Sequence, residues 1–240
     1  MTDYVYVCRD GQNEELRYSI RSVVKHMPPG KIWVVGGKPD WYTGNYIPVV
    51  QRMSKVRNVI SNLSAICSAQ EISGDFILMN DDFFVIKPVK TIKQYHGGLL
   101  SEKIYLYQDL QPTSSYTRSL EETRRRLLRL GIEDPIDYEI HVPMAMNKSN
   151  LREVLGDKGL WRSLYGNLFK VSGKKIDDVK VYTSSPLLRK SYDYLEPKME
   201  YISSDDESFR LLLKPMLESM FPDPTIYELF QSALVLSTET

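Results

Sequence analysis

The first ninety residues alternate short apolar runs with stretches of helical periodicity, and this order constrains the fold more than any other feature of the chain. Apolar runs at 4–8, 32–35 and 75–79 have the length and composition of buried strands. The segments 13–27 and 56–72 between them carry apolar residues at helical spacing. Because strand–helix–strand connections are right-handed and join parallel strands, the pattern predicts an α/β fold with a mixed, largely parallel sheet flanked by helices.

The third predicted strand runs directly into paired carboxylates, in the sequence Asn80-Asp81-Asp82. The loops that follow parallel strands gather at one edge of a sheet, where ligands bind. Acidic side chains there can hold Mg²⁺ or Mn²⁺, which neutralises the phosphates of a nucleotide diphosphate. An isolated Asn-Asp-Asp sequence is also typical of a turn that caps the next segment. Two more loops should open at the same edge, Arg9-Asp10 and Gly36-Gly37-Lys38.

The composition indicates one sizeable domain without an overall charge bias. The chain has 240 residues, of which 42% are hydrophobic, and this is enough for one full core. Its 31 basic and 31 acidic residues cancel, so it has no general attraction to nucleic acid or to an acidic membrane. Two cysteines form no disulfide framework, and no apolar run reaches the length of a membrane span. We therefore expect a cytoplasmic protein without a membrane span.

The second half of the chain is less regular. The segment Lys103-Ile-Tyr-Leu-Tyr107 predicts a strand, and Ser119 with Glu122 predicts a capping box for a helix that ends at Gly131. This helix is basic, and its arginines could bind a phosphorylated acceptor or could form a solvated face balanced by acidic neighbours. The arginines are Arg124, Arg125, Arg126 and Arg129.

The segment 137–143 predicts a further strand, with Glu139 and His141 on one face. Two polar side chains that face the same way in an apolar setting indicate a hydrogen-bond network in the core or a contact with a ligand. The sequence leaves both interpretations open, and His141 is a candidate general base.

A second acidic turn, Asp205-Asp206, follows an apolar Tyr-Ile late in the chain. Ser204 and Glu207 could make it the capping box of the next helix. The turn also repeats the pattern of the central acidic pair, so Asp206 could be a metal ligand or a base.

Five short blocks, in the same order along the chain, resemble the Stealth proteins, which transfer sugar phosphates from nucleotide sugars. The blocks read NEELRYSIRS at 13–22, IWVVGGKPDW at 32–41, FILMNDDFF at 76–84, HVP at 141–143 and FPDPTIYE at 221–228. The chain is also similar to small phage-encoded glycosyltransferases, which would place it in a host cytoplasm. With the alternating pattern, the resemblance implies one GT-A-like (Rossmann-like) domain over 1–240. Its expected parts are a nucleotide-binding half at 1–95, an acceptor half at 96–236 and a tail at 237–240.

The chain departs from the Stealth pattern at two places. The usual Val-Asp-Gly after the first strand is replaced by Cys8-Arg9-Asp10-Gly11, and the usual Asn-Ser-Asn-Ala segment has only a loose counterpart at 57–62. A glycosyltransferase breaks the bond between the sugar carbon and the diphosphate, whereas a sugar-1-phosphate transferase breaks the diphosphate itself. Both remain alternatives, as does a nucleotide-sugar-binding module without turnover.

On this interpretation each candidate residue has a role. Asp81 and Asp82 would hold Mg²⁺ or Mn²⁺ next to a nucleotide diphosphate sugar. Donor contacts are expected from Arg9, Asp10, Arg17, Lys38 and Asn80, although Arg17 could instead form a helix-face ion pair with Glu14. Catalytic roles are expected for His141, Asp206 and Asp82. The acceptor could be modified DNA, a protein or a glycan.

Overall fold

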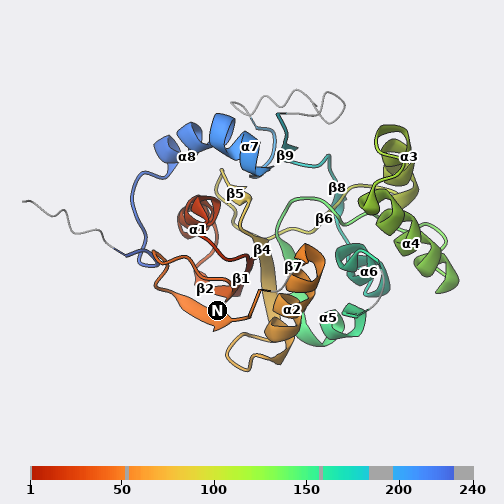
Figure 1. Cartoon of the computed structure of the whole chain (residues 1–240), viewed down its shortest axis with the longest axis horizontal. Coiled ribbons are helices and arrows are strands. Elements are labelled where there is room, and N and C mark those ends of the chain that lie inside the picture. Colours follow the sequence, from red (N-terminus) through yellow and green to blue (C-terminus); the bar gives the residue numbers. More distant parts are fainter. Residues whose placement is uncertain (1, 52–53, 157–158, 184–196, 230–240) are drawn as a thin grey trace, which may run out of the picture.

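The computed structural model describes residues 2–51, 54–156, 159–183 and 197–229 of the chain. Its centre is a five-stranded sheet in the order β3-β2-β1-β4-β7 (Figure 1). The strands are β1 (Thr2–Cys8), β2 (Gly30–Gly36), β3 (Asn45–Pro48), β4 (Asp75–Asn80), β5 (Phe83–Val85), β6 (Tyr95–His96), β7 (Met144–Asn147), β8 (Lys174–Lys175), β9 (Lys180–Val181) and β10 (Tyr201–Ser204). The helices are α1 (Glu14–His26), α2 (Lys55–Ser68), α3 (Leu100–Leu110), α4 (Ser115–Arg129), α5 (Lys148–Val154), α6 (Trp161–Leu168), α7 (Asp206–Ser208), the π-helix η1 (Phe209–Leu213) and α8 (Lys214–Met220).

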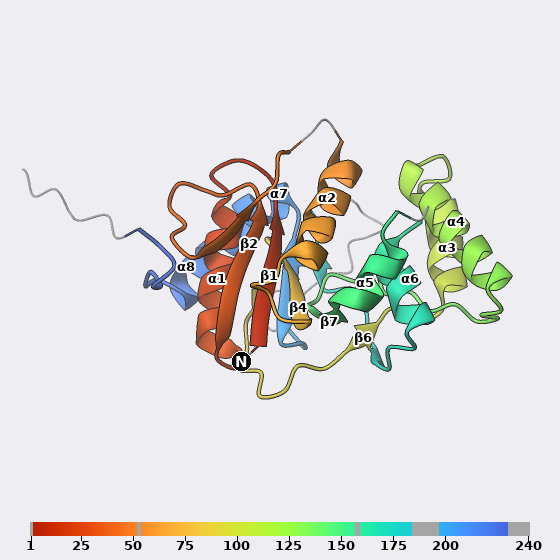
Figure 2. The same ribbon diagram turned by 90° about the horizontal axis from the view of Figure 1, so that it is seen from below.

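The pairing of the central strands confirms the predicted α/β fold with a largely parallel sheet. Strands β3, β2, β1 and β4 are parallel neighbours, and β7 joins β4 antiparallel at one edge. Helix α1 covers one face and α2 covers the other (Figure 2). Because both faces are covered, the central strands are apolar in almost every position rather than alternating.

A small second sheet, β5-β10-β9, lies beside the carboxyl end of β4. Strand β5 follows the acidic pair directly and pairs antiparallel with β10, and β9 pairs parallel with β10. This sheet brings residues that are a hundred positions apart to the side of the acidic loop.

The serines of the first sequence block attach α1 to β5. The Ser19 hydroxyl donates a hydrogen bond to the carbonyl of Phe83, and the Ser22 hydroxyl accepts one from the backbone N–H of Val85 at 2.9 Å. Both serines are fully buried, so their hydroxyls satisfy backbone groups that would otherwise lack partners.

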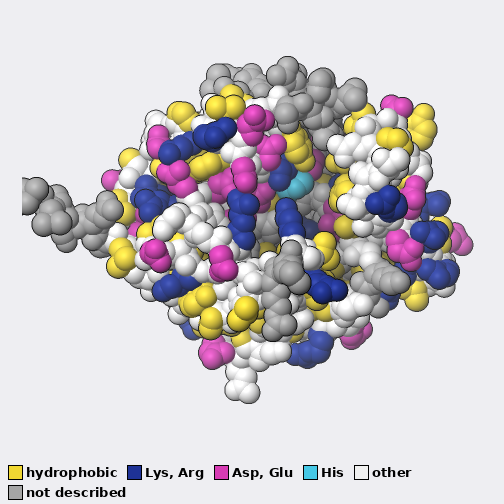
Figure 3. Space-filling model, viewed as in Figure 1, with side chains coloured by type: hydrophobic (Ala, Val, Ile, Leu, Met, Phe, Trp, Pro, Cys, Tyr) yellow, Lys and Arg dark blue, Asp and Glu magenta, His cyan; other side chains and the backbone are white. Residues whose placement is uncertain are grey.

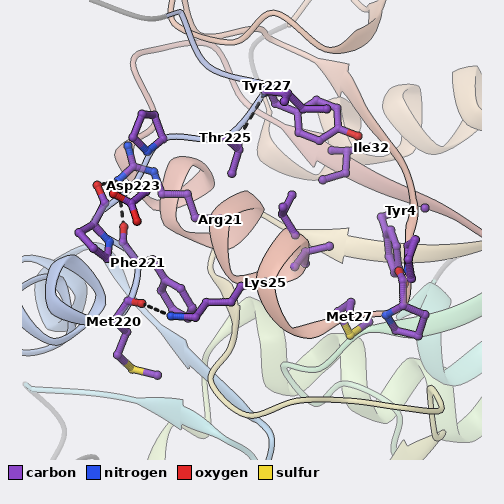
Figure 4. Close-up of a pocket in the computed structure, with 18 residues that line it drawn as sticks. Tyr4, Arg21, Lys25, Met27, Ile32, Met220, Phe221, Asp223, Thr225 and Tyr227 are labelled. Carbon is purple, nitrogen blue, oxygen red and sulfur yellow. Dashed lines mark hydrogen bonds between the residues drawn. The ribbon is translucent and has the colours of Figure 1, made fainter.

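The first sequence block, at 13–22, also forms an ion pair with the last one, at 221–228. Arg21 donates from Nε and Nη2 to the two carboxylate oxygens of Glu228, at 2.8 and 2.7 Å. Glu228 is 5% exposed and also accepts the backbone N–H of Thr225. Figure 4 shows Arg21 directed at the segment that runs from Phe221 to Tyr227. Two blocks that are 200 residues apart are therefore joined by a buried bidentate ion pair, which explains their residue types structurally.

The glycine pair of the second block allows β1 and β2 to end side by side. Gly36 has a positive φ of 117°, and a Cβ there would lie 2.2 Å from the carbonyl oxygen of Cys8. The backbone N–H of Gly37 donates to that same oxygen at 3.1 Å. Only glycine fits this turn, because any side chain would collide with the end of β1.

Several predictions for the second half are wrong in the structure. The segment 103–107 belongs to helix α3, since burial of Leu100 and Ile104 follows helical spacing while Tyr105 is exposed. Helix α4 begins at Ser115, four residues before the predicted capping box, with Ser114 as its N-cap.

Two further predictions of local structure also fail. The segment 137–143 is a loop leading into β7, and the polar contacts of its side chains replace strand pairing. The late capping box forms between Asp205 and Ser208 instead of Ser204 and Glu207. None of the described helices combines the length and apolar character that crossing a bilayer requires.

Candidate active site

A cleft of about 1100 Å³ opens at the carboxyl ends of β1 and β4. The surrounding elements include α2, the ends of α3 and α4, the start of α6 and the segment leading into α7. Figure 3 shows this face of the molecule hollowed, with acidic and basic side chains gathered around the hollow. In an open, largely parallel sheet this edge is where ligands bind, so the cleft is the candidate site.

Asp81 lies in the wall of the cleft nearest the sheet. Its Oδ2 accepts a hydrogen bond from Asn13 Nδ2 at 2.7 Å, while Asn13 Oδ1 caps α1 through the backbone N–H of Leu16. Burial, followed by the neighbouring charge of Asp82, raises the pKa of Asp81 to about 6. The first and third sequence blocks therefore meet at this carboxylate.

Asp82 faces the cleft beside Asp81 and is held by the small sheet. Its Oδ2 accepts from Lys180 Nζ at 3.0 Å and from the Ser203 hydroxyl at 3.2 Å. Its Oδ1 is buried and has no hydrogen-bond partner. A buried carboxylate oxygen without a partner is costly, and a cation or a bound donor group would satisfy it.

Glu15 is a third carboxyl group of this wall that the sequence analysis did not single out. It is 7% exposed, and its nearest hydrogen-bond partner is the Ser204 hydroxyl at 3.4 Å. Burial, followed by the charges of Asp81, Asp82 and Asp206, raises its pKa to about 8. Helical spacing could have identified Glu15 as a site residue. It lies four residues before Ser19, and therefore on the face of α1 that packs against β5.

These residues fit a divalent cation with only two protein ligands. No group of three His, Cys, Asp or Glu side chains suited to a metal occurs in the part of the chain that the structure describes. Asp81 and Asp82 supply neighbouring carboxylates, and Asp82 Oδ1 is available. Mg²⁺ commonly takes one or two carboxylates and completes its shell with water and substrate phosphates, so this donor set suits it.

Arg9 and Asp206 form an ion pair at the rim of the cleft. The guanidinium lies 2.9 Å from the carboxylate, and the two side chains are 62% and 76% exposed. An ion pair this open contributes little to stability, so either side chain can be released to a ligand at small cost.

His141 and Asp178 lie together in the cleft. His141 Nδ1 is 2.8 Å from Oδ2 and 3.0 Å from Oδ1 of Asp178. The imidazole and the Phe83 ring meet edge to face, with centroids 6.3 Å apart. Glu139 also lines the cleft and accepts the backbone N–H of Ser163 at 2.8 Å, so the two polar side chains of the 137–143 segment do share one site.

The far wall of the cleft combines buried cations with aromatic rings. Lys103 Nζ donates to Asp137 at 2.9 Å, and buried Arg162 donates to two backbone carbonyls. The rings of Tyr107 and Tyr116 meet edge to face with centroids 5.0 Å apart. Each of these cations already has an acceptor, so this wall offers an aromatic surface rather than free positive charge.

Three residues predicted to contact the donor do not line the cleft. Arg17 lies over the Trp41 ring, 4.8 Å from its centroid, with Nε 3.6 Å from Glu228, on the side of α1 away from the acidic pair. Lys38 lies over the Tyr46 ring, and Asp10 is exposed beside Gly37. The predicted residues that the structure brings into the cleft are Arg9, Asn80, Asp81, Asp82, His141 and Asp206.

The fold is similar to that of a known glycosyltransferase. The structure of the galactosyltransferase LgtC, in complex with donor and acceptor sugar analogs, matches with a TM-score of 0.51 over 93% of this chain and 96% of that one. The sequences are 11% identical, so the match shows the fold: an α/β sheet flanked by helices, as in the GT-A fold of LgtC. No family model and no curated protein matches the sequence, and the resemblance to Stealth and phage proteins stays a prediction.

Proposed function

We propose that this protein is a metal-dependent glycosyltransferase that uses a nucleotide diphosphate sugar as donor. The observation that carries the proposal is the pair of carboxylates, Asp81 and Asp82, placed at the carboxyl end of β4 inside the cleft. The similarity to LgtC, which was solved with donor and acceptor sugar analogs, supports this class of substrate.

Mg²⁺ or Mn²⁺ would be held by Asp81 and Asp82, and it would supply positive charge to the donor diphosphate when bound. Lys180 already neutralises one oxygen of Asp82. With a cation on Asp82, the ammonium group of Lys180 would also favour negative charge on a departing nucleotide.

The donor would lie along the sheet side of the cleft. Val7, Lys55 and Val59 line the end nearest β1 and α2, where a nucleoside would pack. Arg9 would leave its exposed partner Asp206 to bind the diphosphate, since a guanidinium makes paired hydrogen bonds with phosphate. Asn80 also lines the cleft, and Asp10 remains a proposed contact to the base or ribose from the rim.

The acceptor would enter against the aromatic wall. Tyr116 is the part of α4 that lines the cleft, whereas Arg125 and Arg129 pair with Glu122 on the same helix. Arg125 and Arg129 are therefore better explained as part of a solvated face than as a polyanion site. Modified DNA, a protein and a glycan remain the candidate acceptors.

A sugar-1-phosphate transferase is the second candidate, favoured by the five Stealth-like blocks. The same carboxylates and cations would serve either reaction, because both place negative charge on a nucleotide leaving group. The products separate them: a nucleoside diphosphate indicates glycosyl transfer, and a nucleoside monophosphate indicates phosphotransfer. A binding module without turnover would take up donor and release neither.

The deciding experiment is a panel of nucleotide sugars incubated with the full chain and Mn²⁺ or Mg²⁺, with chromatography of the released nucleotide. We expect one donor to yield nucleoside diphosphate and EDTA to abolish its release. Calorimetry with the same panel measures uptake independently of turnover. If no donor binds in the presence of Mn²⁺, the proposal is wrong.

A further inference from the structure

Asp178 is the only carboxylate in the described part of the chain that hydrogen-bonds to His141. It contacts the imidazole at Nδ1 alone, and Nε2 makes no hydrogen bond with another described residue. The histidine belongs to a sequence block, whereas Asp178 lies in an irregular segment 37 positions later. The pair exists only because the fold brings β9 next to the 137–143 loop.

The Asp178 carboxylate is itself fixed in place. Its Oδ1 accepts the backbone N–H of His141 at 3.1 Å and that of Lys180 at 3.3 Å, which leaves Oδ2 directed at His141 Nδ1. Burial favours the neutral acid, but the contacts with His141 and the nearby Lys103 outweigh it and lower the pKa of Asp178. An ionised carboxylate only accepts hydrogen bonds, so Nδ1 must carry a proton and the neutral ring keeps its lone pair on Nε2.

Charged groups of both signs surround this pair. Lys103 bridges Asp137 at 2.9 Å and the backbone carbonyl of Glu139 at 2.7 Å. The charged groups that face His141 and Asp178 from the neighbouring elements are Lys103, Lys180, Arg162, Asp137 and Glu139. Asp206, the other candidate base, is instead 76% exposed and joined to an arginine at the rim.

We propose that Asp178 is a positioning residue that holds His141 in the Nδ1–H tautomer, so that Nε2 of His141, and not Asp206, accepts the proton of the acceptor hydroxyl. This role rests on the proposed function. The acceptor oxygen forms its new bond to the sugar carbon as its proton moves to Nε2. The bond from that carbon to the donor diphosphate breaks, and its electron pair leaves with the nucleotide. The imidazolium that forms is stabilised by the carboxylate of Asp178.

The substitution Asp178→Asn tests the tautomer directly. The amide oxygen should keep the position that accepts the two backbone N–H groups, so the amide NH₂ would face Nδ1 and donate to it. The ring proton must then move to Nε2. The chain has three histidines, and ¹⁵N NMR of the labelled full chain resolves their tautomers, with His141 identified by His141→Gln. For the neutral ring, we expect Nδ1–H in the wild type and Nε2–H in Asp178→Asn.

Turnover supplies the second measurement. Asp178→Asn should lower kcat for nucleotide release about 10²–10⁴-fold and leave the donor KM within about twofold, because the donor is bound by the other wall. Asp109→Asn, the same change at an exposed position on α3, should alter neither kcat nor the tautomer.

Three results would overturn the inference: an Nε2–H tautomer in the wild type, full turnover by Asp178→Asn, or a larger loss of kcat in Asp206→Asn than in Asp178→Asn. The tautomer does not depend on turnover. If the wild type releases no nucleotide from any donor but shows the expected change of tautomer, the proposed function fails while the positioning by Asp178 stands.

Discussion

The two walls of the cleft are built in different ways. The wall nearest the sheet consists of the end of β4, the first turn of α1 and the loop after β1, and its acidic residues come from sequence blocks that are each continuous. The far wall is assembled from α3, α4, α6, the 137–143 loop and the segment before β9. A parallel sheet fixes where its loops open, whereas no comparable rule fixes irregular segments. The order of the strands therefore predicted where the acidic pair lies, but it predicted neither that Glu15 joins the pair nor which segments complete the far wall.

Substitution of Asp82, which the sequence alone identified, is the strongest test of the difference between the two walls. Asp82→Asn should reduce nucleotide release about 10³-fold, because it removes charge where the cation and the leaving diphosphate would lie. Released nucleotide is measured by chromatography at saturating donor and Mn²⁺. Asp109→Asn is the matched control, and circular dichroism checks that both variants are folded. Activity within tenfold of the wild type would contradict a catalytic role for the acidic wall.

The second test concerns the sequence blocks at 13–22 and 221–228, and it asks whether their residues serve the reaction or the stability of the fold. Arg21→Ala leaves Glu228 buried without its main partner, and we expect the free energy of unfolding to fall by about 3–5 kcal/mol. Urea unfolding measures this change. Arg9→Ala, which removes an exposed cation, is the control and should change stability by less than about 1 kcal/mol. Equal stability of the two variants would show that the Arg21–Glu228 pair does not stabilise the packing of the 221–228 segment against α1.

The acidic wall also predicts how stability depends on pH. The pKa of Glu15 is raised from 4.5 to about 8, so the folded state binds more protons than the unfolded state between these values. The free energy of unfolding should therefore fall as the pH rises from 4.5 to 8, by on the order of 5 kcal/mol for this group. Urea unfolding across this pH range measures the slope.

Glu15→Gln should flatten that slope, whereas Glu14→Gln, at the exposed neighbour that pairs with Lys214, should leave it unchanged. Mn²⁺ should also flatten the slope in the wild type, because a cation on the adjacent carboxylates favours their ionised forms. Asp81, whose pKa is raised to about 6, contributes to the slope below pH 6. A slope between pH 6 and 8 that survives Glu15→Gln would therefore mean that the Glu15 carboxyl group is not responsible for it.

The smallest effect is expected at the rim. Arg9→Ala should raise the donor KM about three- to tenfold with little change in kcat, since an exposed cation contributes to binding the diphosphate more than to the chemical step. Steady-state kinetics with varied donor measures both constants, and Lys38→Ala, outside the cleft, is the control. If Lys38→Ala has the larger effect, the donor lies against Lys38 in the Gly36-Gly37-Lys38 loop and not in the cleft.

Local sequence signals were reliable where one rule decided the outcome. The α/β order of the first ninety residues and the acidic pair after β4 follow from apolar periodicity along the chain. The prediction for 103–107 failed because a short run of apolar and aromatic residues also fits a helix with one buried face, here Leu100 and Ile104. Over five residues, periodicity cannot distinguish a strand from such a helix.

The sequence by itself determined the sheet, the helices on its two faces and the position of the paired aspartates, because strand and helix periods and the parallel order are local properties. Only the tertiary structure decided that Arg17 lies beside Glu228 rather than in the cleft, that Glu15 joins the acidic wall, and that Asp178 contacts His141. These partners are separated by between 37 and 211 positions. Long-range contacts depend on how the whole chain packs, and no short pattern encodes them.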